Sequence, residues 1–239
     1  MSNPYFNFKQ FSIQQELCSM KVGTDGVLIG AWANVSHASR ILDIGTGTGL
    51  IALMLAQRSK ATIVGVDAEE NAFKQSEINF NASPWKERLT IVLSKIQEYL
   101  SDEKFDIIVS NPPYFTGYYS SDDLSRDIAR AADVLLPYED LITAAKRLLK
   151  EEGRLSLILP ADQQEKISSI ALQNGFVLSR CTFVKTKIGK DPKRVLLELV
   201  NSNKEIELIC DELVIQSDDN GRVYTQEYIN LTKDFYLAF

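Results

Sequence analysis

Residues 41–49 read Ile-Leu-Asp-Ile-Gly-Thr-Gly-Thr-Gly, and this stretch decides the fold. The apolar run at 41–44 is typical of a short buried strand, and the apolar segment at 50–58 predicts a helix. Glycines in the turn between them allow the backbone to approach a ligand closely. The alternative is a tight turn without a ligand. A strand, a glycine-rich turn and a helix in this order predict an α/β fold.

Strand and helix patterns alternate along the rest of the chain. Apolar and β-branched runs predict seven strands, at 41–44, 62–66, 89–93, 105–109, 155–159, 176–184 and 194–200. Helical spacing predicts helices at 50–58, 69–81, 137–150 and 162–174, the third followed by Gly153 and the last stopped by Gly175. Repeated units of this kind predict a mostly parallel sheet with helices on both faces. No helix separates the last two strands, so the last strand is expected to be antiparallel.

Residues 1–39 lack this alternation. Thr24 or Asp25 is expected to cap a short helix that ends near Trp32. The tail at 223–239 has helical spacing and many aromatic residues. We therefore expect one α/β domain over residues 40–239, preceded by an N-terminal extension over residues 1–39.

The composition limits the classes of partner. The net charge is −6 at pH 7 and the sequence pI is near 5.0, which argues against non-specific nucleic-acid binding over the whole surface but allows a local basic patch. Three separated cysteines and one histidine predict no metal site, and the cysteines are expected to be buried apolar fillers. The first residues do not resemble a signal peptide, and no apolar stretch approaches the roughly 20 residues of a membrane span. We expect a cytoplasmic protein.

The spacing of the glycine turn selects a cofactor. Dinucleotide sites use Gly-x-Gly-x-x-Gly, whereas Gly45, Gly47 and Gly49 are separated by single residues. Asp43 precedes them, and its carboxylate would repel a pyrophosphate but suits a sulfonium cofactor with an amino-acid end. Asp67 ends the second predicted strand, where a carboxylate can accept both ribose hydroxyls, or alternatively cap the next helix. Together these residues favour S-adenosylmethionine over a nicotinamide dinucleotide.

A second motif ends the strand predicted at 105–109. Residues 110–114 read Ser-Asn-Pro-Pro-Tyr, and two prolines cannot continue a central strand. They also stiffen the backbone. The side-chain amide of Asn111 and the carbonyl of Pro112 are therefore expected at fixed positions on the sheet edge that holds the cofactor.

This motif suits methylation of an exocyclic aromatic amine, whose nitrogen lone pair is delocalised into the ring. Asn111 Oδ1 and the Pro112 carbonyl can accept its two N–H bonds and aim the lone pair at a methyl donor. Fixed dipoles then stabilise the positive charge that develops on nitrogen, and in-line placement supplies much of the remaining acceleration. Tyr114 can stack on a flipped base. The alternative is a proline-rich turn with a buried aromatic residue.

These motifs together resemble class I methyltransferases that act on amino nitrogens. The segments that look like the bacterial tRNA1(Val) adenine-37 N6-methyltransferase family are residues 8–11, 20–26, 30–33, 52–58, 83–85, 194–197, 228 and 235–236. The similarity covers essentially the whole chain. It implies a Rossmann-like class I methyltransferase fold, S-adenosylmethionine as cofactor, tRNA as partner, and N6-methyladenosine beside the anticodon as product; we also expect a monomer.

The resemblance also implies roles for individual residues. Cofactor contacts are expected from Asp43, Gly45, Gly47, Gly49 and Asp67, with Thr24, Asp25 and the 1–39 extension lying over the cofactor. Asn111, Pro112 and Tyr114 are expected to act on the base. Related enzymes often place an acid after the third strand to contact the cofactor's adenine, but this chain has Ser94-Lys95-Ile96 there. The backbone of Ile96 can still bind the adenine ring.

Basic residues gather in two places. Lys185, Lys187, Lys190 and Lys193 surround the loop between the last two predicted strands, and Arg126 and Arg130 follow the Asn-Pro-Pro-Tyr motif. In an acidic protein these are candidates for phosphate contacts. The alternative is a solvated loop.

Other functions share parts of this pattern. Glutamine N5-methyltransferases of release factors use the same four-residue motif but carry an N-terminal helical domain, and only about forty residues precede the first strand here. DNA adenine methyltransferases usually add a target-recognition region, which the sequence lacks. A non-catalytic binding module would not need the Asn111–Tyr114 motif.

Overall fold

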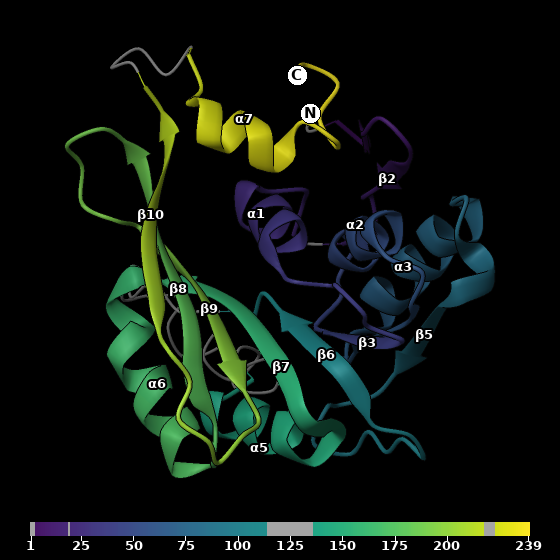
Figure 1. Cartoon of the computed structure of the whole chain (residues 1–239). Helices are drawn as coiled ribbons and strands as arrows, with labels where there is room; N and C mark the ends of the chain where they lie inside the picture. The colour runs from purple at the N-terminus through teal and green to yellow at the C-terminus, as the bar shows by residue number, and fades with distance from the viewer. Residues whose placement is uncertain (1–2, 19, 114–135, 218–222) are drawn as a thin grey trace, which may run out of the picture.

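The computed structural model describes residues 3–18, 20–113, 136–217 and 223–239. Its large sheet has eight strands in the order β10-β8-β9-β7-β6-β3-β4-β5 (Figure 1). The bounds are β3 (Arg40–Ile44), β4 (Thr62–Asp67), β5 (Leu89–Leu93), β6 (Phe105–Ser110), β7 (Leu149–Pro160), β8 (Val177–Lys187), β9 (Arg194–Val200) and β10 (Ile209–Gln216).

The seven predicted strands are confirmed, and among the described residues the large sheet has an eighth. β9 pairs antiparallel with both β7 and β8, as expected, and the other pairs are parallel. The unpredicted strand is β10, which pairs parallel with β8, so the last strand of the chain is not the antiparallel one. β10 lies at the sheet edge with only Leu213 buried, and it therefore lacks the apolar run that marks a central strand.

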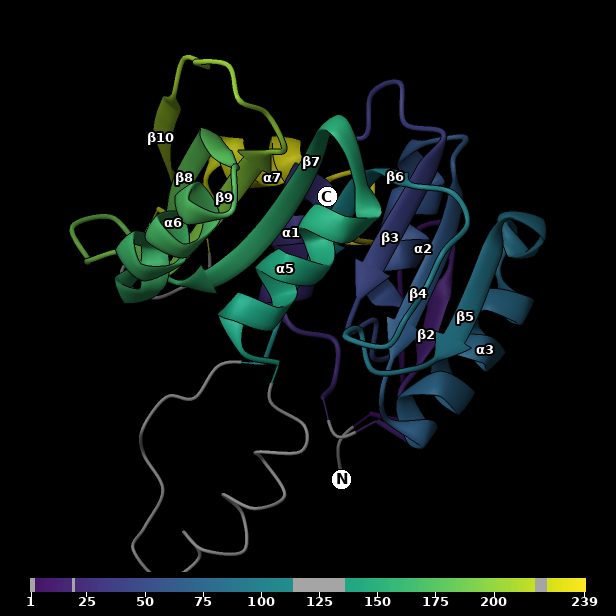
Figure 2. The same cartoon turned by 90° about the horizontal axis from the view of Figure 1, so that it is seen from below.

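Helices cover both faces of the sheet (Figures 1 and 2). Their bounds are α1 (Thr24–Trp32), α2 (Leu50–Arg58), α3 (Glu70–Ala82), α5 (Tyr138–Leu148), α6 (Gln164–Gln173) and α7 (Gln226–Thr232), with short 3-10 helices η1 (Lys86–Arg88) and η2 (Ala161–Gln163). Helices α1 and α2 contribute to one apolar core, and α5 and α6 contribute to the other. The sheet thus separates two cores, as the alternating pattern predicts.

The end of α5 differs from the sequence prediction. The helix expected over 137–150 ends at Leu148, and β7 begins at Leu149. Gly153 lies inside β7 rather than after a helix, and a Cβ there would approach the carbonyl oxygen of Lys150 to 2.9 Å. Glycine is needed for this close approach of backbone to backbone. Gly175, with φ of +73°, does end α6 as expected.

The N-terminal segment contains more structure than its sequence indicates. A small hairpin is formed by β1 (Tyr5–Asn7) and β2 (Ser12–Gln14), strands too short to show an alternation. Helix α1 has the expected span, but its N-cap is Gly23, without a side-chain hydrogen bond. Neither expected cap, Thr24 or Asp25, occupies that position, and Asp25 forms an ion pair of 2.7 Å with Arg194.

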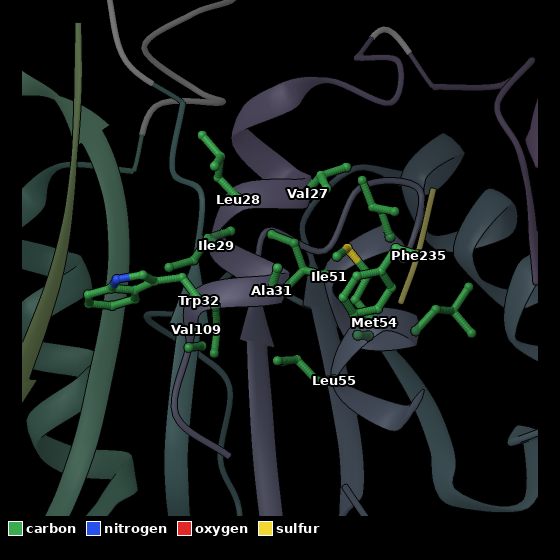
Figure 3. Packing of buried hydrophobic residues seen from close by; sticks show 14 of the residues in the cluster. Val27, Leu28, Ile29, Ala31, Trp32, Ile51, Met54, Leu55, Val109 and Phe235 are labelled. Carbon is green, nitrogen blue, oxygen red and sulfur yellow. The ribbon is translucent and has the colours of Figure 1, made fainter. Parts of the chain in front are cut away.

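Helix α1 packs beside α2 on one face of the sheet (Figure 3). Its two glycines allow close contact with α2, since a Cβ at Gly30 would lie 2.7 Å from Met54 Sδ. At its end, Trp32 Nε1 donates to Thr182 Oγ1 over 2.9 Å, and the Arg180 guanidinium lies 3.7 Å from the centroid of the indole. Residues 24–32 are therefore part of the core of the domain.

The two ends of the chain meet on this face (Figure 1). The backbone N–H of Lys9 donates to the carbonyl of Phe235 over 2.8 Å. Aromatic side chains from both ends surround this bond, among them Phe6, Phe8, Tyr228, Tyr236 and Phe239. Within the tail at 223–239, only Gln226–Thr232 is helical. The residues after this helix contribute Tyr236 and Phe239 to the aromatic cluster.

Two of the three cysteines agree with the expectation. Cys18 and Cys181 are buried free thiols, but Cys210 is exposed because it lies on the edge strand β10. Within the described ranges, no helix has the length and apolar character needed to cross a bilayer.

Candidate active site

The register of β3 and β6 brings the two sequence motifs together. Ile44 and Ser110 are direct partners in this parallel pair, so the glycine turn and the Asn-Pro-Pro segment begin at the same level of the sheet. Ser110 is fully buried, and its Oγ donates to the carbonyl of Ile44 over 2.8 Å. Sequence reasoning missed this residue, although a serine between an apolar strand and the Asn-Pro-Pro segment was a visible signal.

The three glycines of the turn all have positive φ but serve different purposes. Gly45 and Gly47, at +70° and +55°, would carry a Cβ with no atom within 4 Å. They leave the space above the turn open to a ligand. Gly49, at +81°, would place a Cβ 2.5 Å from the ring of buried Phe80, so it is needed for the packing of α3.

Asp43, on β3, supports the glycine turn through side-chain hydrogen bonds. Its side chain is fully buried, and Oδ2 accepts hydrogen bonds from Thr46 Oγ1 at 2.6 Å and from the Ala52 N–H at 3.2 Å. No described residue donates to Oδ1. Burial raises the pKa of the Asp43 carboxyl from 3.8 to about 7, and these two donors oppose the rise only in part. This position supports the loop that a cofactor would contact.

Asp67 stands at the end of β4, where a ribose-binding acid was expected. Its Oδ2 accepts from the Gly47 N–H at 2.9 Å, and its Oδ1 accepts from the Glu69 N–H at 3.0 Å. The carboxylate therefore links the glycine turn to the residue before α3, and its contact with ribose hydroxyls stays a prediction. A carboxylate has about four acceptor positions, so two remain for ligand hydroxyls.

A cleft of about 630 Å³ opens above these strand ends. Its lining includes Gly45, Gly47, Asp67, Ile96 and Asn111 of the predicted site. From the N-terminal segment, Cys18 and Met20 also line it. Burial, with the nearby charges of Asp67 and Glu69, raises the pKa of the Cys18 thiol to about 11, so this side chain stays neutral. The size suits a nucleoside-containing ligand.

Asn111 lines this cleft and carries an unused acceptor. Its Oδ1 is buried and has no hydrogen-bond partner among the residues described here. A buried acceptor without a donor costs free energy, and active sites are where proteins commonly keep one. Pro112 and Pro113 also line the cleft. The site thus offers a fixed acceptor to an N–H group of a ligand.

Several predicted residues lie elsewhere or outside the described ranges. Tyr114, Arg126 and Arg130 fall within 114–135, which the structure does not describe. Thr24 and Asp25 begin α1 and are absent from the cleft lining, whereas Cys18 and Met20 were missed. Over the part of the chain that is described, no group of three or more His, Cys, Asp or Glu side chains is placed to hold a metal ion.

The predicted basic loop lies at the same sheet edge as the cleft. Arg194 opens β9 opposite Pro160, the last residue of β7, so residues 188–193 connect β8 to β9 beyond the carboxyl ends of the parallel strands (Figure 1). Lys185 forms an ion pair of 2.7 Å with Glu212. Lys190 and Lys193 are exposed.

Known proteins resemble this chain in both sequence and fold. A family model described as methyltransferase small domain matches residues 23–187. A tRNA1(Val) (adenine(37)-N6)-methyltransferase of Phocaeicola vulgatus is 49% identical over 237 residues, covering 99% of each chain. A protein of the same name from Christiangramia forsetii is 45% identical over 243 residues, again covering 99% of each.

The chain belongs to the tRNA1(Val) (adenine(37)-N6)-methyltransferase family. It is thus a methyltransferase, and the family and class I fold imply S-adenosylmethionine as the general methyl donor. A predicted O-methyltransferase from Agrobacterium tumefaciens has the same fold, with a TM-score of 0.69 at 18% identity, covering 88% of this chain and 96% of that one. A ribosomal protein L11 methylase from Lactobacillus delbrueckii subsp. bulgaricus gives a TM-score of 0.52 at 17% identity, over 73% and 75%.

In the glycine turn of this methyltransferase, Gly47 and Gly49 provide a matched pair of variants. Gly49→Ala is expected to lower the free energy of unfolding by more than about 2 kcal/mol, because positive φ and contact with Phe80 both oppose a Cβ. Gly47→Ala carries only the backbone strain, about 1–2 kcal/mol, but is expected to weaken binding of S-adenosylhomocysteine. Urea unfolding and calorimetric titration measure both effects. Equal stability losses in the two variants would contradict the assignment.

The raised pKa of Asp43 predicts a pH-dependent stability. The folded protein binds the carboxyl proton more tightly than the unfolded chain, so the free energy of unfolding should fall as pH rises from 3.8 to about 7. The contribution is on the order of 4 kcal/mol for a shift of this size. Asp43→Asn should remove it, which urea unfolding across this pH range checks by the difference in slope between variant and wild type. Identical slopes would rule out the shift.

Proposed function

We propose that this enzyme transfers a methyl group from S-adenosylmethionine to the N6 amino group of adenine 37 in tRNA1(Val). The observation that carries this proposal is the buried, unpaired Oδ1 of Asn111 in a cleft lined by open glycines. The names of the full-length relatives supply the nucleotide and the tRNA. They also disfavour glutamine N5 methylation and DNA adenine methylation.

The cofactor is proposed to occupy the cleft along the strand ends. S-adenosylmethionine, when bound, supplies an electrophilic methyl group on a sulfonium sulfur. Asp67 would hold the ribose hydroxyls, and the open backbone at Gly45 and Gly47 would allow the amino-acid end to lie close to the turn. Cys18 and Met20 would close the cleft from the N-terminal segment, in the manner expected for residues 1–39.

Asn111 and Pro112 are proposed to hold the amino group of the target base. Asn111 Oδ1 accepts one N–H bond and the Pro112 carbonyl accepts the other, so nitrogen becomes more tetrahedral and its lone pair points toward the methyl group. The Ser110–Ile44 hydrogen bond fixes this segment to the glycine turn, so both reactants are positioned by one rigid unit. The product ammonium is strongly acidic, so no tuned general base is needed before transfer.

The tRNA is proposed to contact the loop at 188–193. This loop begins where the parallel strands end, so phosphates bound there would lie on the same edge as the cleft. Lys190 and Lys193 are exposed, whereas the charge of Lys185 is already balanced by Glu212. Lys187, Arg126 and Arg130 remain candidates for further phosphate contacts.

Replacing Asn111 tests the reaction. Asn111→Ala should lower the rate of N6-methyladenosine formation by roughly 100-fold or more, the usual cost of removing one aligned polar group at a transition state. Affinity for S-adenosylhomocysteine should stay unchanged. The assay combines labelled S-adenosylmethionine with tRNA from a strain lacking the modification, followed by identification of the labelled nucleoside. Asn230→Ala, an exposed position on α7, is the control; label in a nucleoside other than N6-methyladenosine would refute the proposed product.

Salt dependence tests the basic loop. The double variant Lys190→Ala, Lys193→Ala should bind tRNA more weakly than wild type, and the slope of log affinity against log salt should drop by about 1–2. Lys185→Ala, which removes a lysine already paired with Glu212, should change both quantities less. Filter binding between about 50 and 200 mM salt measures the slopes. Equal slopes for all three proteins would exclude a role for the loop.

A further inference from the structure

The segment after β5 lacks the acid that often contacts the cofactor's adenine. Lys95 stands there, is exposed and lines the cleft, but an ammonium group cannot accept a hydrogen bond from an amino group. Beside it, the backbone N–H of Ile96 donates to no described residue. This segment therefore offers a donor for a purine ring nitrogen but no side-chain acceptor at position 95 for the exocyclic amine.

The order of the strands indicates where a base would lie. Asn111 follows β6, the glycine turn follows β3, Asp67 ends β4, and the Ile96 segment follows β5 at the sheet edge. A cofactor with its reactive end at Asn111 and its ribose at Asp67 has only the β5 side of the cleft left for its base. Apolar side chains on that side include Ile96 and Leu136, which suit the faces of a purine.

A carboxylate from another element faces the same part of the cleft. Asp140 lies in the first turn of α5 and lines the cleft together with Gln97. Gln97 Nε2 donates to Asp140 Oδ2 over 2.9 Å, while no described residue donates to Oδ1. Asp140 is therefore an oriented acceptor with one oxygen available.

The two elements that carry this pair are held together by an exposed arginine. Arg147, two turns further along α5, donates to the carbonyl of Tyr99 at 2.6 Å and to that of Ile96 at 2.9 Å. These bonds fix the turn after β5 against α5. The two hydrogen bonds of the Arg147 side chain thus hold the Ile96 segment against the helix that carries Asp140.

We propose that Asp140 reads the adenine of the cofactor, accepting a hydrogen bond from its exocyclic amino group at Oδ1 while the Ile96 N–H donates to the adjacent ring nitrogen. This assignment rests on the proposed function, because it assumes that S-adenosylmethionine occupies the cleft. Asp140, from helix α5, would thus supply the acidic group that is absent from the segment after β5. Gln97 is a positioning residue that holds the carboxylate.

The test compares two ligands on four proteins by calorimetric titration. The ligands are S-adenosylhomocysteine and its 6-deamino analogue, in which hydrogen replaces the amino group of the purine. The proteins are wild type, Asp140→Ala, Gln97→Ala and the control Glu139→Ala, an exposed neighbour that does not line the cleft. Asp140→Ala should weaken binding of S-adenosylhomocysteine about tenfold to hundredfold and leave the deamino analogue nearly unchanged. Gln97→Ala should give a smaller loss with the same selectivity.

Three other binding results overturn the proposal. An equal loss for both ligands would make Asp140 a structural residue of the cleft wall, and no loss for either would place the amino group elsewhere. Wild-type protein that binds neither ligand would reject the proposed cofactor as well. Selective loss at Asp140 in a protein that does not methylate tRNA would reject only the proposed substrate and leave this assignment standing.

Discussion

The hydrogen bond from Ser110 Oγ to the carbonyl of Ile44 is the constraint on which the site depends. It lies between two central strands in register, at the level where both strands end, and it is inaccessible to water. On one side of it the chain turns through Gly45 and Gly47, and on the other it enters two prolines that cannot continue the strand. A methyl donor bound on the first side and an amine bound on the second would therefore meet at a distance set by the sheet.

Burial of the Asp43 carboxylate is an unfavourable free-energy contribution that this arrangement requires. Its Oδ2 supports the glycine turn through Thr46 and Ala52, but its burial in an apolar sheet disfavours the charge. Asp67 supports the same turn from the next strand without being fully buried. The turn is thus held by two carboxylates of different character, one beneath it and one at the rim of the cleft.

The central strands and both motifs could be predicted from the sequence, because buried strands and glycine turns have strong local patterns. The sequence was insufficient where a residue's role is decided by a distant partner. Thr24 or Asp25 was expected to cap α1, but the N-cap is Gly23 and the Asp25 carboxylate pairs with Arg194. Gly49 is required by Phe80, and Asp140 reaches the cleft only because α5 packs on the turn after β5. The edge strand β10 escaped prediction because most of its side chains are not buried.

The meeting of the two chain ends has a consequence for biosynthesis. Lys9 and Phe239 are 230 residues apart, yet Lys9 Nζ donates to the Phe239 carbonyl and the aromatic residues around them form one cluster. During translation the first segment emerges roughly 10–50 s before the last, at ordinary elongation rates. During that interval the N-terminal aromatic residues lack their partners from the tail, so the nascent chain exposes part of their apolar surface. Chaperones consequently have a window in which to act before this cluster closes.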